Sequence, residues 1–466
     1  MENLIAAIDL GTTKVSVAVG HKTNLGVKVI AFGEAPSKGI KRGRVENVRL
    51  ATQALNKALK DVEDQINQKV KKALVGIAGQ DISCVKLEPL TVARENINSL
   101  ITDEEIQKIT LNTYHTPLDN GNSVLYSVPQ SYNVDNYMSV SEPVGMLGRT
   151  IQARFKLFVG KENSRMMIEN TLKLAGVEPL EIVLEPIASA KAVLTDDEME
   201  VGSILVDIGG GTTDVIVYHH NVIRYAGIIP FGGNCITEDI CIGCGISNTN
   251  AEYIKTNYGC CFSDYAEADK RLLIPTMGSN GGKEVNLKVL SKIIQARMEE
   301  ILEAVCWHVE QSEYKDYIRS GIVFTGGGSR LGSLTNLANV VTGYEARLGS
   351  PNAFAIDPSS CDKAKEPTSS TAVGMLIHAI QRMEDEGLIY TNCLTSVTAV
   401  PQQETITITD PVLIPEEGNA IVEPANGESG KGKGRGKGKG FWITVKQGVN
   451  KALNGEGLFG EMNNEV

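Results

Sequence analysis

The stretch from 204 to 218 constrains the fold of this chain more than any other. An apolar run, Ile204-Leu205-Val206, ends at Asp207, and three glycines and two threonines follow before a second run rich in β-branched residues. This pattern predicts a strand, a tight turn and a returning strand. Glycines let the N–H groups of such a turn approach an anion closely, and a carboxylate such as Asp207 can hold a hydrated Mg²⁺. The stretch therefore predicts a cradle for nucleotide phosphates, although an ordinary glycine-rich hairpin has a similar pattern.

A second copy of this motif lies at 5–19, about 198 residues earlier in the chain. Asp9 matches Asp207, and Gly11-Thr12-Thr13 is matched to Gly211-Thr212-Thr213, which puts Lys14 at the place of Asp214. Self-similarity at this distance indicates duplication of a whole domain. Two related domains, each with one hairpin, would bind a nucleotide in the cleft between them, because ligand sites often lie at domain interfaces.

Further glycine turns fit the same kind of site. Residues 320–334 read as a buried strand, the turn Gly326-Gly327-Gly328 and the start of a helix, where a flat ring could lie against bare backbone. Phe231-Gly232-Gly233-Asn234 offers another turn for an anion. The helix after it carries Glu252 and Lys255 on one face, an arrangement that also suits a solvated ion pair.

Composition limits the class of protein. With 466 residues the chain has room for two or more domains, and its net charge of -11 argues against a protein that is mainly a nucleic-acid binder. The N-terminal residues predict no signal peptide, no run of about 18 apolar residues predicts a membrane span, and the odd number of cysteines suits a reducing cytoplasm. Cys241, Cys244, Cys260 and Cys261 could form a zinc set. The adjacent second pair makes joint tetrahedral ligation awkward, so free thiols are favoured.

The composition changes after about residue 388. Residues 389–430 are rich in prolines, acids and polar residues and predict a linker, and a Gly/Lys run follows at 430–440. From 431 to 451 the chain has seven basic residues and no acid. A short amphipathic helix is predicted at 441–454, which would lie on anionic lipid rather than on the protein core or on nucleic acid. Its membrane-facing residues would be Phe441, Trp442, Val445, Lys446, Val449, Lys451 and Leu453.

The glycine motifs, in this order, resemble those of the actin, Hsp70 and sugar-kinase superfamily over residues 1 to about 388. Within that superfamily the chain resembles the FtsA family of bacterial division proteins. The resemblance is carried by the tail and by the stretches 37–47, 73–79, 187–193 and 232–255.

The resemblance implies an α/β, actin-like ATPase fold with two duplicated domains around a nucleotide cleft, inserted subdomains, and a disordered C-terminal linker that ends in an amphipathic helix. The expected division is 1–84, 167–200 and 366–388 for subdomain 1A, 85–166 for the insert 1C, 201–240 and 317–365 for 2A, 241–316 for 2B, 389–440 for the linker and 441–454 for the helix.

The resemblance also implies roles for particular residues. Asp9 and Asp207 would position Mg²⁺ through water, and Glu185 would orient a hydrolytic water, although an acid at the N-cap of a helix with Pro186 at N1 explains it equally well. Glu252 and Lys255 would contact the ribose and adenine. The remaining nucleotide-binding residues would be Gly11, Thr12, Thr13, Lys14, Gly209, Gly210, Gly211, Thr212, Thr213, Gly232, Gly233, Asn234, Gly326, Gly327, Gly328 and Arg330.

By family resemblance, this would be an ATP-binding protein that anchors FtsZ filaments to the cytoplasmic face of the membrane at the division site. It would self-assemble into filaments with nucleotide, contact later division proteins, and turn ATP over weakly or not at all. Two alternatives within the superfamily are a soluble small-molecule kinase and a rod-shape actin homologue. An Hsp70-type chaperone is disfavoured because the proline-broken tail cannot form a β-rich substrate domain.

Overall fold

The computed structural model describes residues 3–119, 121–267, 269–275, 282–352, 354–385, 387–390 and 393–396. Residues 1–397 make one compact unit, and a second unit begins at Thr398. The predicted helix at 441–454, with every residue expected to face a membrane, therefore lies outside the described residues, as does most of the predicted linker.

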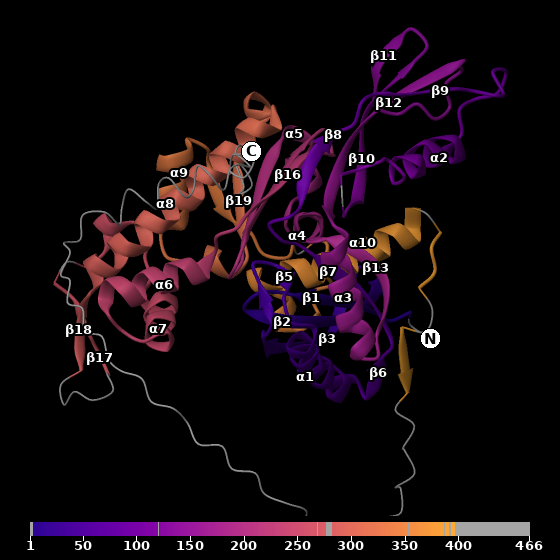
Figure 1. The fold of residues 1–466 in the computed structure, drawn as a ribbon. Helices are drawn as coiled ribbons and strands as arrows, with labels where there is room; N and C mark the ends of the chain where they lie inside the picture. Colours follow the sequence, from indigo (N-terminus) through magenta and orange to yellow (C-terminus); the bar gives the residue numbers. More distant parts are fainter. Residues whose placement is uncertain are drawn as a thin grey trace, which may run out of the picture. The chain divides into compact units, whose positions relative to one another are not determined.

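Two five-stranded sheets with the same connectivity form the body of the first unit (Figure 1). Three antiparallel strands are followed by two parallel ones in each sheet, as a duplicated domain requires. In order across the sheets, the strands are β3 (Gly26–Pro36), β2 (Lys14–Thr23), β1 (Ile5–Leu10), β7 (Lys72–Ile77) and β13 (Glu178–Leu184) in one, and β16 (Val222–Ile229), β15 (Thr213–His219), β14 (Ser203–Ile208), β19 (Ile322–Thr325) and β20 (Ala346–Leu348) in the other.

The strand register corrects the match between the two hairpins. Leu10 pairs with Val15 in the first, and Ile208 pairs with Thr213 in the second, so both turns have the same length. The expectation that Lys14 stands at the place of Asp214 is wrong. Aligning the two Gly-Thr-Thr sequences required a gap in the first turn, but the strand pairings show no difference in turn length. Ser16 pairs with Asp9 as Asp214 pairs with Asp207, so Ser16 is the residue that corresponds to Asp214.

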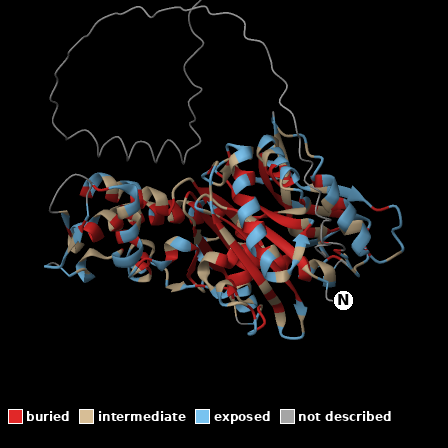
Figure 2. Ribbon diagram, turned by 90° about the horizontal axis from the view of Figure 1, so that it is seen from below, coloured by how far each residue is buried: buried red, intermediate tan, exposed pale blue. Residues whose placement is uncertain are grey.

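Two helices connect the halves of this unit, α4 (Glu185–Val193) and α10 (Ser370–Asp385). Both are buried along most of their length, and Figure 2 shows buried residues concentrated in the sheets and the helices packed on them. Helix α4 begins one residue earlier than expected: Leu184 is the N-cap, and Glu185 and Pro186 are the first two helical residues. Glu185 is thus not the N-cap, although its carboxylate still lies in the first turn. The other helices of this body are α1 (Val48–Ile66), α3 (Glu162–Leu174), α5 (Asp196–Val201) and α9 (Leu334–Thr342).

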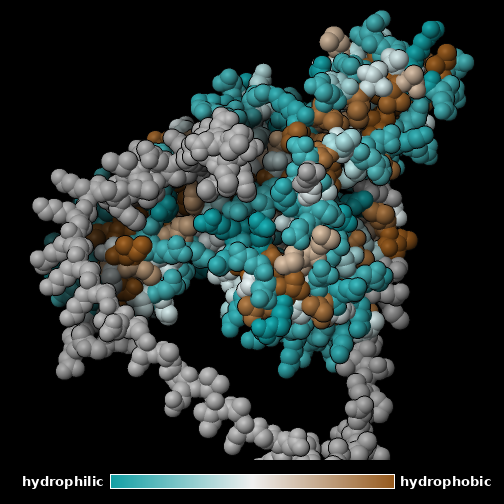
Figure 3. Space-filling model, viewed as in Figure 1, coloured by the Kyte–Doolittle hydropathy of each residue, from teal (hydrophilic) through white to brown (hydrophobic). Residues whose placement is uncertain are grey.

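A third sheet is inserted after β7 and carries its own apolar core. Helix α2 (Asp103–Thr113) packs against it and begins with a capping box, in which Thr102 and Glu105 bond to each other's backbone. The strands are β8 (Ser83–Lys86), β9 (Leu90–Ala93), β10 (Asn122–Val134), β11 (Tyr137–Val140) and β12 (Thr150–Lys161). Tyr137 and Met138 on β11 are exposed. Figure 3 shows hydrophobic surface, in brown, on this inserted part of the molecule at the upper right of the view.

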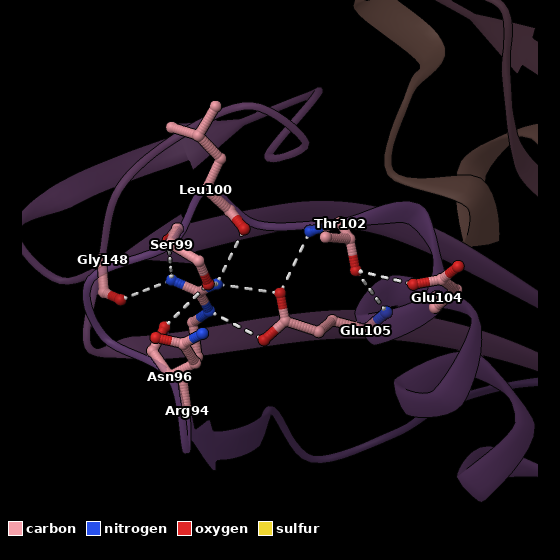
Figure 4. Close-up of polar contacts among 8 residues, drawn as sticks. All are labelled: Arg94, Asn96, Ser99, Leu100, Thr102, Glu104, Glu105 and Gly148. Atoms are coloured by element: carbon pink, nitrogen blue, oxygen red, sulfur yellow. Dashed lines mark hydrogen bonds and ion pairs between the residues drawn. The ribbon is translucent and has the colours of Figure 1, made fainter.

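Arg94 holds the loops of this insert together (Figure 4). Its side chain is 1% exposed and forms a two-pronged contact with the carboxylate of Glu105, with both N–O distances 2.9 Å. The same guanidinium donates to three backbone carbonyls, those of Ser99, Leu100 and Gly148. One buried cation therefore fastens two loops to the start of α2.

A second insert follows β16 and is mainly helical. It contains α6 (Gly233–Cys244), α7 (Asn248–Tyr258) and the long helix α8 (Leu287–Ser312), with a small hairpin of β17 (Arg271–Ile274) and β18 (Lys283–Asn286). Arg297 on α8 bonds to Asp239 on α6, which fixes the two helices together.

The predicted start of the linker is wrong for the residues after α10. Strand β21 (Leu394–Ser396) pairs with β6 (Gln68–Val70), and the carbonyl of Cys393 accepts the N–H groups of Lys71 and Lys72. The hydroxyl of Tyr390 donates to Glu181 at 3.1 Å. Prolines and acids dominate the composition farther along, but these first residues have an apolar and aromatic content that the composition of the whole stretch concealed.

Candidate nucleotide site

A cavity of about 560 Å³ lies between the two hairpins, the glycine turn after β19 and helix α7. Most of the predicted site residues line it: Asp9, Gly11, Thr12, Thr13, Lys14, Glu185, Asp207, Gly209, Gly210, Gly211, Thr212, Gly233, Asn234, Glu252, Lys255, Gly326, Gly327, Gly328 and Arg330. Two do not. Thr213 is buried and donates to the carbonyl of Phe231, and Gly232 packs against the backbone of Gly209 and Gly210.

The two hairpin turns meet directly. A Cβ atom on Gly210 would lie 1.8 Å from the hydroxyl oxygen of Thr13, and one on Gly211 would lie 2.5 Å from that of Thr12. Any side chain at either glycine would push the turns apart. Glycine is therefore required here for the approach of one half of the molecule to the other.

Asp207 is held in place by neighbours from three elements. Its Oδ2 accepts a hydrogen bond of 2.7 Å from Ser189 on α4, and the hydroxyl of Ser189 lies 3.0 Å from that of Thr371 on α10. Gly326 has a φ of +82°, and a Cβ there would lie 2.2 Å from the Oδ1 of Asp207. The carboxylate is thus fixed between the two connecting helices and the third glycine turn.

Besides Glu252, four carboxylic acids line this cavity: Asp9, Glu185, Asp207 and Asp214. The pKa of Asp9 is raised to about 7, chiefly by burial; the charge of Lys14 lowers it, and the charges of Asp207 and Glu34 add to the increase. Burial also raises the pKa of Asp207. For Glu185 and Asp214, burial and then the charges of the other acids hold the pKa well above the usual range. Such a group of acids favours a bound cation, because a cation lowers the cost of their ionisation.

Asp214 was not expected in the site. It pairs with Asp207 across the ladder of β14 and β15, so the two side chains lie on the same face of the sheet. The sequence contained this signal, since residues an equal distance either side of a hairpin turn face the same way. The wrong alignment with Lys14 hid it.

Lys14 is paired within the protein. Its ammonium group forms an ion pair with Glu34, which also binds Lys363 at 3.1 Å. Sequence reasoning did not find Glu34, because it lies on β3, far from any glycine motif. The ion pair places the charge of Lys14 at the cavity wall before any ligand arrives.

Glu252 and Lys255 do more than pair on a helix surface. The Lys255 ammonium is buried and donates to the carbonyl of Gly233, the hydroxyl of Thr237 and the carboxylate of Glu252 at 3.0, 2.8 and 2.6 Å. These bonds fasten α7 to the start of α6 at the cavity wall. Arg330 lies at the more exposed edge, 3.7 Å from Glu366.

Other residues that no sequence motif predicted also line the cavity. Gly43 donates its N–H to the hydroxyl of Thr12 at 3.1 Å, which joins the hairpin of β4 (Ile40–Lys41) and β5 (Arg44–Val45) to the first phosphate turn. Thr256, Asn257, Leu331, Pro367, Thr368 and Thr371 complete the wall.

A larger cavity of about 820 Å³ lies at the other end of the second hairpin. It is lined by Lys191 of α4, Tyr218 of β15 and Gln381 of α10 among others, and contains none of the predicted site residues. The residues that the sequence predicts to bind nucleotide therefore line the smaller cavity and not this one.

All nine cysteines are free thiols. Within the described ranges, no group of three or more His, Cys, Asp or Glu side chains is arranged to hold a metal by itself. No helix of the described part of the chain is long and apolar enough to cross a membrane.

Comparison with known proteins identifies the family. A family model described as "Cell division protein FtsA" matches residues 204–374, and one described as "SHS2 domain inserted in FTSA" matches residues 79–159, which hold most of the inserted sheet. The FtsA of Pseudomonas aeruginosa is 31% identical over 383 residues, which are 82% of this chain and 90% of that protein. The FtsA of Escherichia coli K12 is 28% identical over 382 residues, 80% of this chain and 89% of that protein.

Solved structures agree on the fold. The PilM-PilN type IV pilus biogenesis complex matches with a TM-score of 0.56 at 15% identity, over 81% of this chain and 98% of that one. MreB5 of Spiroplasma citri, solved with ADP, matches with a TM-score of 0.50 at 15% identity, over 82% and 99%. The duplicated sheets, the inserted sheet and these sequence matches lead to one conclusion: the chain belongs to the FtsA family of cell division proteins and has the actin-like fold.

Proposed function

We propose that the cleft binds ATP with Mg²⁺ and that the nucleotide sets the conformation of a membrane-bound division adaptor. The observation that carries the proposal is the meeting of the two phosphate-type turns, Gly11–Lys14 and Gly209–Thr212, over buried carboxylates. Backbone N–H groups and threonine hydroxyls would donate to phosphate oxygens. Asp9 and Asp207 suit a hydrated Mg²⁺, which keeps most of its water and takes one or two carboxylates.

The rest of the cavity suits the nucleoside. Gly326, Gly327 and Gly328 offer bare backbone to a flat base, and Lys255 and Glu252 of α7 line the same cavity. A bound Mg²⁺ would neutralise phosphate charge, and Glu185, which lines the same cavity, would orient a water. Burial raises the pKa of Glu185, so this carboxyl group favours its protonated form, which cannot accept a proton from water; this favours slow turnover over fast phosphoryl transfer.

The connecting helices give the cleft a mechanical role. Thr371 of α10 and Glu185 of α4 line the nucleotide cavity, and Gln381 and Lys191, farther along the same helices, line the larger one. Closure of the two halves on ATP would turn these helices at their crossing and favour one of two states, and such a shift requires no hydrolysis.

The tail and the family supply the cellular part of the proposal. The helix predicted at 441–454 would hold the protein on the cytoplasmic face of the membrane, and subdomain 2B would bind FtsZ, so that the protein anchors FtsZ filaments at the division site. Self-assembly into filaments and contacts with later division proteins belong to the same proposal. So does the division into subdomains 1A, 1C, 2A and 2B at the boundaries given above.

Calorimetric titration with Mg·ATP tests the cleft. Asp207→Ala removes the carboxylate that Ser189 and Gly326 hold in place, and we expect it to abolish binding. Asp197→Asn, an acid-to-amide change at an exposed position of α5, serves as the control and should bind normally. Unchanged affinity in the Asp207 variant would refute the assignment of the site.

Co-sedimentation with liposomes tests the membrane role separately. The full chain should pellet with vesicles that contain anionic lipid, and a chain without residues 431–466 should not. The Asp207→Ala variant should pellet like the wild type, because the substituted residue lies in the cleft and lipid binding is assigned to the tail. Equal pelleting with and without the tail would remove the membrane claim.

A further inference from the structure

A chain of ion pairs joins two residues that line the nucleotide cavity. Lys14, in the turn of the first hairpin, pairs with the Oε1 of Glu34 on β3. The other carboxylate oxygen of Glu34 lies 3.1 Å from the ammonium of Lys363. Lys363 lies 3.2 Å from Glu366, and Glu366 lies 3.7 Å from Arg330 at the cavity edge. The chain therefore runs from the phosphate turn of one half to the glycine turn of the other.

The middle of this chain lies outside the cavity. Lys363 stands on η4 (Asp362–Lys365), a short 3₁₀ helix that packs against β3. Neither Lys363 nor the two acids beside it belong to the residues that line the cavity in the described part of the chain. An effect of Lys363 on a bound nucleotide would therefore act through the neighbouring carboxylates rather than by contact.

The charges of the chain do not balance. Lys14, Lys363 and Arg330 carry three positive charges, and Glu34 and Glu366 carry two negative ones. A bound triphosphate would compete with Glu34 for the ammonium of Lys14. If Lys14 turned to the phosphates alone, the carboxylate of Glu34 would be left beside another anion, and like charges repel. The second contact of Glu34, with Lys363, removes this cost.

The duplicated half of the molecule provides an internal comparison. By strand register, Thr212 corresponds to Lys14, and Ile228 corresponds to Glu34. The second hairpin thus has neither the cation nor the carboxylate at the matching positions. The pairing of two strands around a phosphate turn therefore does not require this ion pair, which is a property of the first hairpin.

We propose that Lys363 is a positioning residue for the nucleotide phosphates: it keeps Glu34 neutralised, so that Lys14 is available to the ligand. This inference rests on the proposed nucleotide function. Glu366 holds Lys363 from the other side and accepts a hydrogen bond of 3.3 Å from Thr368, which lines the cavity. If the ion pairs only fastened η4 to β3, their loss would affect all ligands of the cavity alike.

The test compares a ligand that has phosphates with one that has none. Mg·ATP binding to the full-length protein is measured by calorimetry, and adenosine binding by equilibrium dialysis. Lys363→Met keeps an unbranched apolar side chain and removes the charge. We expect it to bind Mg·ATP about fivefold more weakly, the size of effect of a partly exposed ion pair, because Glu34 then retains Lys14. Adenosine binding should stay unchanged, since adenosine offers no phosphate to Lys14.

Two further variants make the test specific. Lys365→Met is the matched control on the same 3₁₀ helix, since Lys365 bonds to the carbonyl of Pro358 and to Asp362 at 3.0 and 3.5 Å. It should bind both ligands as the wild type does. Glu34→Gln removes the charge that competes for Lys14 and should bind Mg·ATP more tightly. Adding Lys363→Met to Glu34→Gln should then have little effect, and this double-mutant cycle isolates the interaction between the two residues.

The outcomes separate this inference from the function on which it rests. A loss of Mg·ATP affinity in Lys363→Met that disappears in the Glu34→Gln background supports the positioning role. Unchanged Mg·ATP affinity, the same loss in both backgrounds, or an equal loss of adenosine affinity overturns it, while binding of Mg·ATP by the wild type leaves the proposed function standing. If the wild type binds no Mg·ATP, the proposed function fails and this inference fails with it.

Discussion

Gly374 of α10 and Ala188 of α4 are in backbone contact. A Cβ atom at position 374 would lie 1.8 Å from the carbonyl oxygen of Ala188, so the helices cross at a distance that only glycine allows. Gly374→Ala should therefore destabilise the protein by about 1–3 kcal/mol through overpacking. At an exposed helical position, a Gly→Ala substitution would instead increase the stability, because alanine is the better helix former.

Chemical denaturation measures this effect. Gly243→Ala on α6 is the matched control, since the atom nearest to its Cβ is the end of the Ile293 side chain, which can move. We expect a smaller loss there. Equal stability of Gly374→Ala and the wild type would show that the helix crossing tolerates a wider spacing. That result would weaken the proposal that α4 and α10 turn at their crossing when ATP binds.

Local patterns predicted the two hairpins well. Strand periodicity, glycine turns and the repeated Asp-Gly-Thr motif depend on neighbours in the chain, and the sheets at β1–β2 and β14–β15 follow them. The alignment of the two hairpins was less accurate. Matching identical residues aligned Lys14 with Asp214, whereas the hydrogen-bonded pairing of the strands aligns Ser16 with Asp214. Identity of side chains is a poorer guide than turn length when one copy has more glycines than the other.

Contacts between distant segments could not be predicted in this way. Glu34 reaches Lys14 from a neighbouring strand, and Ser189 reaches Asp207 from a helix. The resemblance to a known family found Glu185 and Lys255, but it did not predict that Lys255 would be buried between two helices. Pairings of this kind depend on how the elements pack, and periodicity contains no information on them.

The insert after β7 should depend strongly on Arg94. Arg94→Ala leaves Glu105 and three carbonyls without their buried donor, and the loss of one partner of such a pair costs about 3–5 kcal/mol. We expect faster hydrogen exchange in residues 95–105 and 145–149 and a lower unfolding temperature. Arg165→Ala removes an exposed ion pair with Glu169 one helical turn away and should cost less than about 1 kcal/mol. Similar losses for the two variants would contradict a special role of Arg94.

Stability should fall in mild acid because of His308. Burial lowers the pKa of His308 to about 4, its Nε2 has no hydrogen-bond partner among the described residues, and its Nδ1 lies 2.9 Å from the hydroxyl of Tyr225. The folded protein keeps this ring neutral, whereas the unfolded chain takes up a proton below its ordinary pKa of about 6.5. The stabilising contribution is thus complete above that pH and is lost as the pH falls toward 4, by about 2 kcal/mol at pH 5.

Denaturation of the wild type and His308→Gln at pH 7 and pH 5 checks this direction. The wild type should lose about 2 kcal/mol more than the variant between the two values, because glutamine does not titrate. His115→Gln, at an exposed position, should fall in parallel with the wild type. A constant difference between the wild type and His308→Gln would show that protonation of His308 is not linked to unfolding.

The residues just after α10 should behave as part of the folded body. Deleting 398–466 removes the second unit and should leave the unfolding free energy of the first unchanged. Deleting 387–466 also removes Tyr390, Cys393 and β21, with the bonds to Glu181, Lys71 and Lys72. The buried side chains and lost hydrogen bonds together should cost about 2–4 kcal/mol. Tyr390→Phe in the longer chain should cost about 1 kcal/mol, the usual net value of one hydrogen bond. Equal stability of the two truncated chains would place the start of the linker at residue 387, and would mean that the pairing of β21 with β6 contributes nothing to the fold.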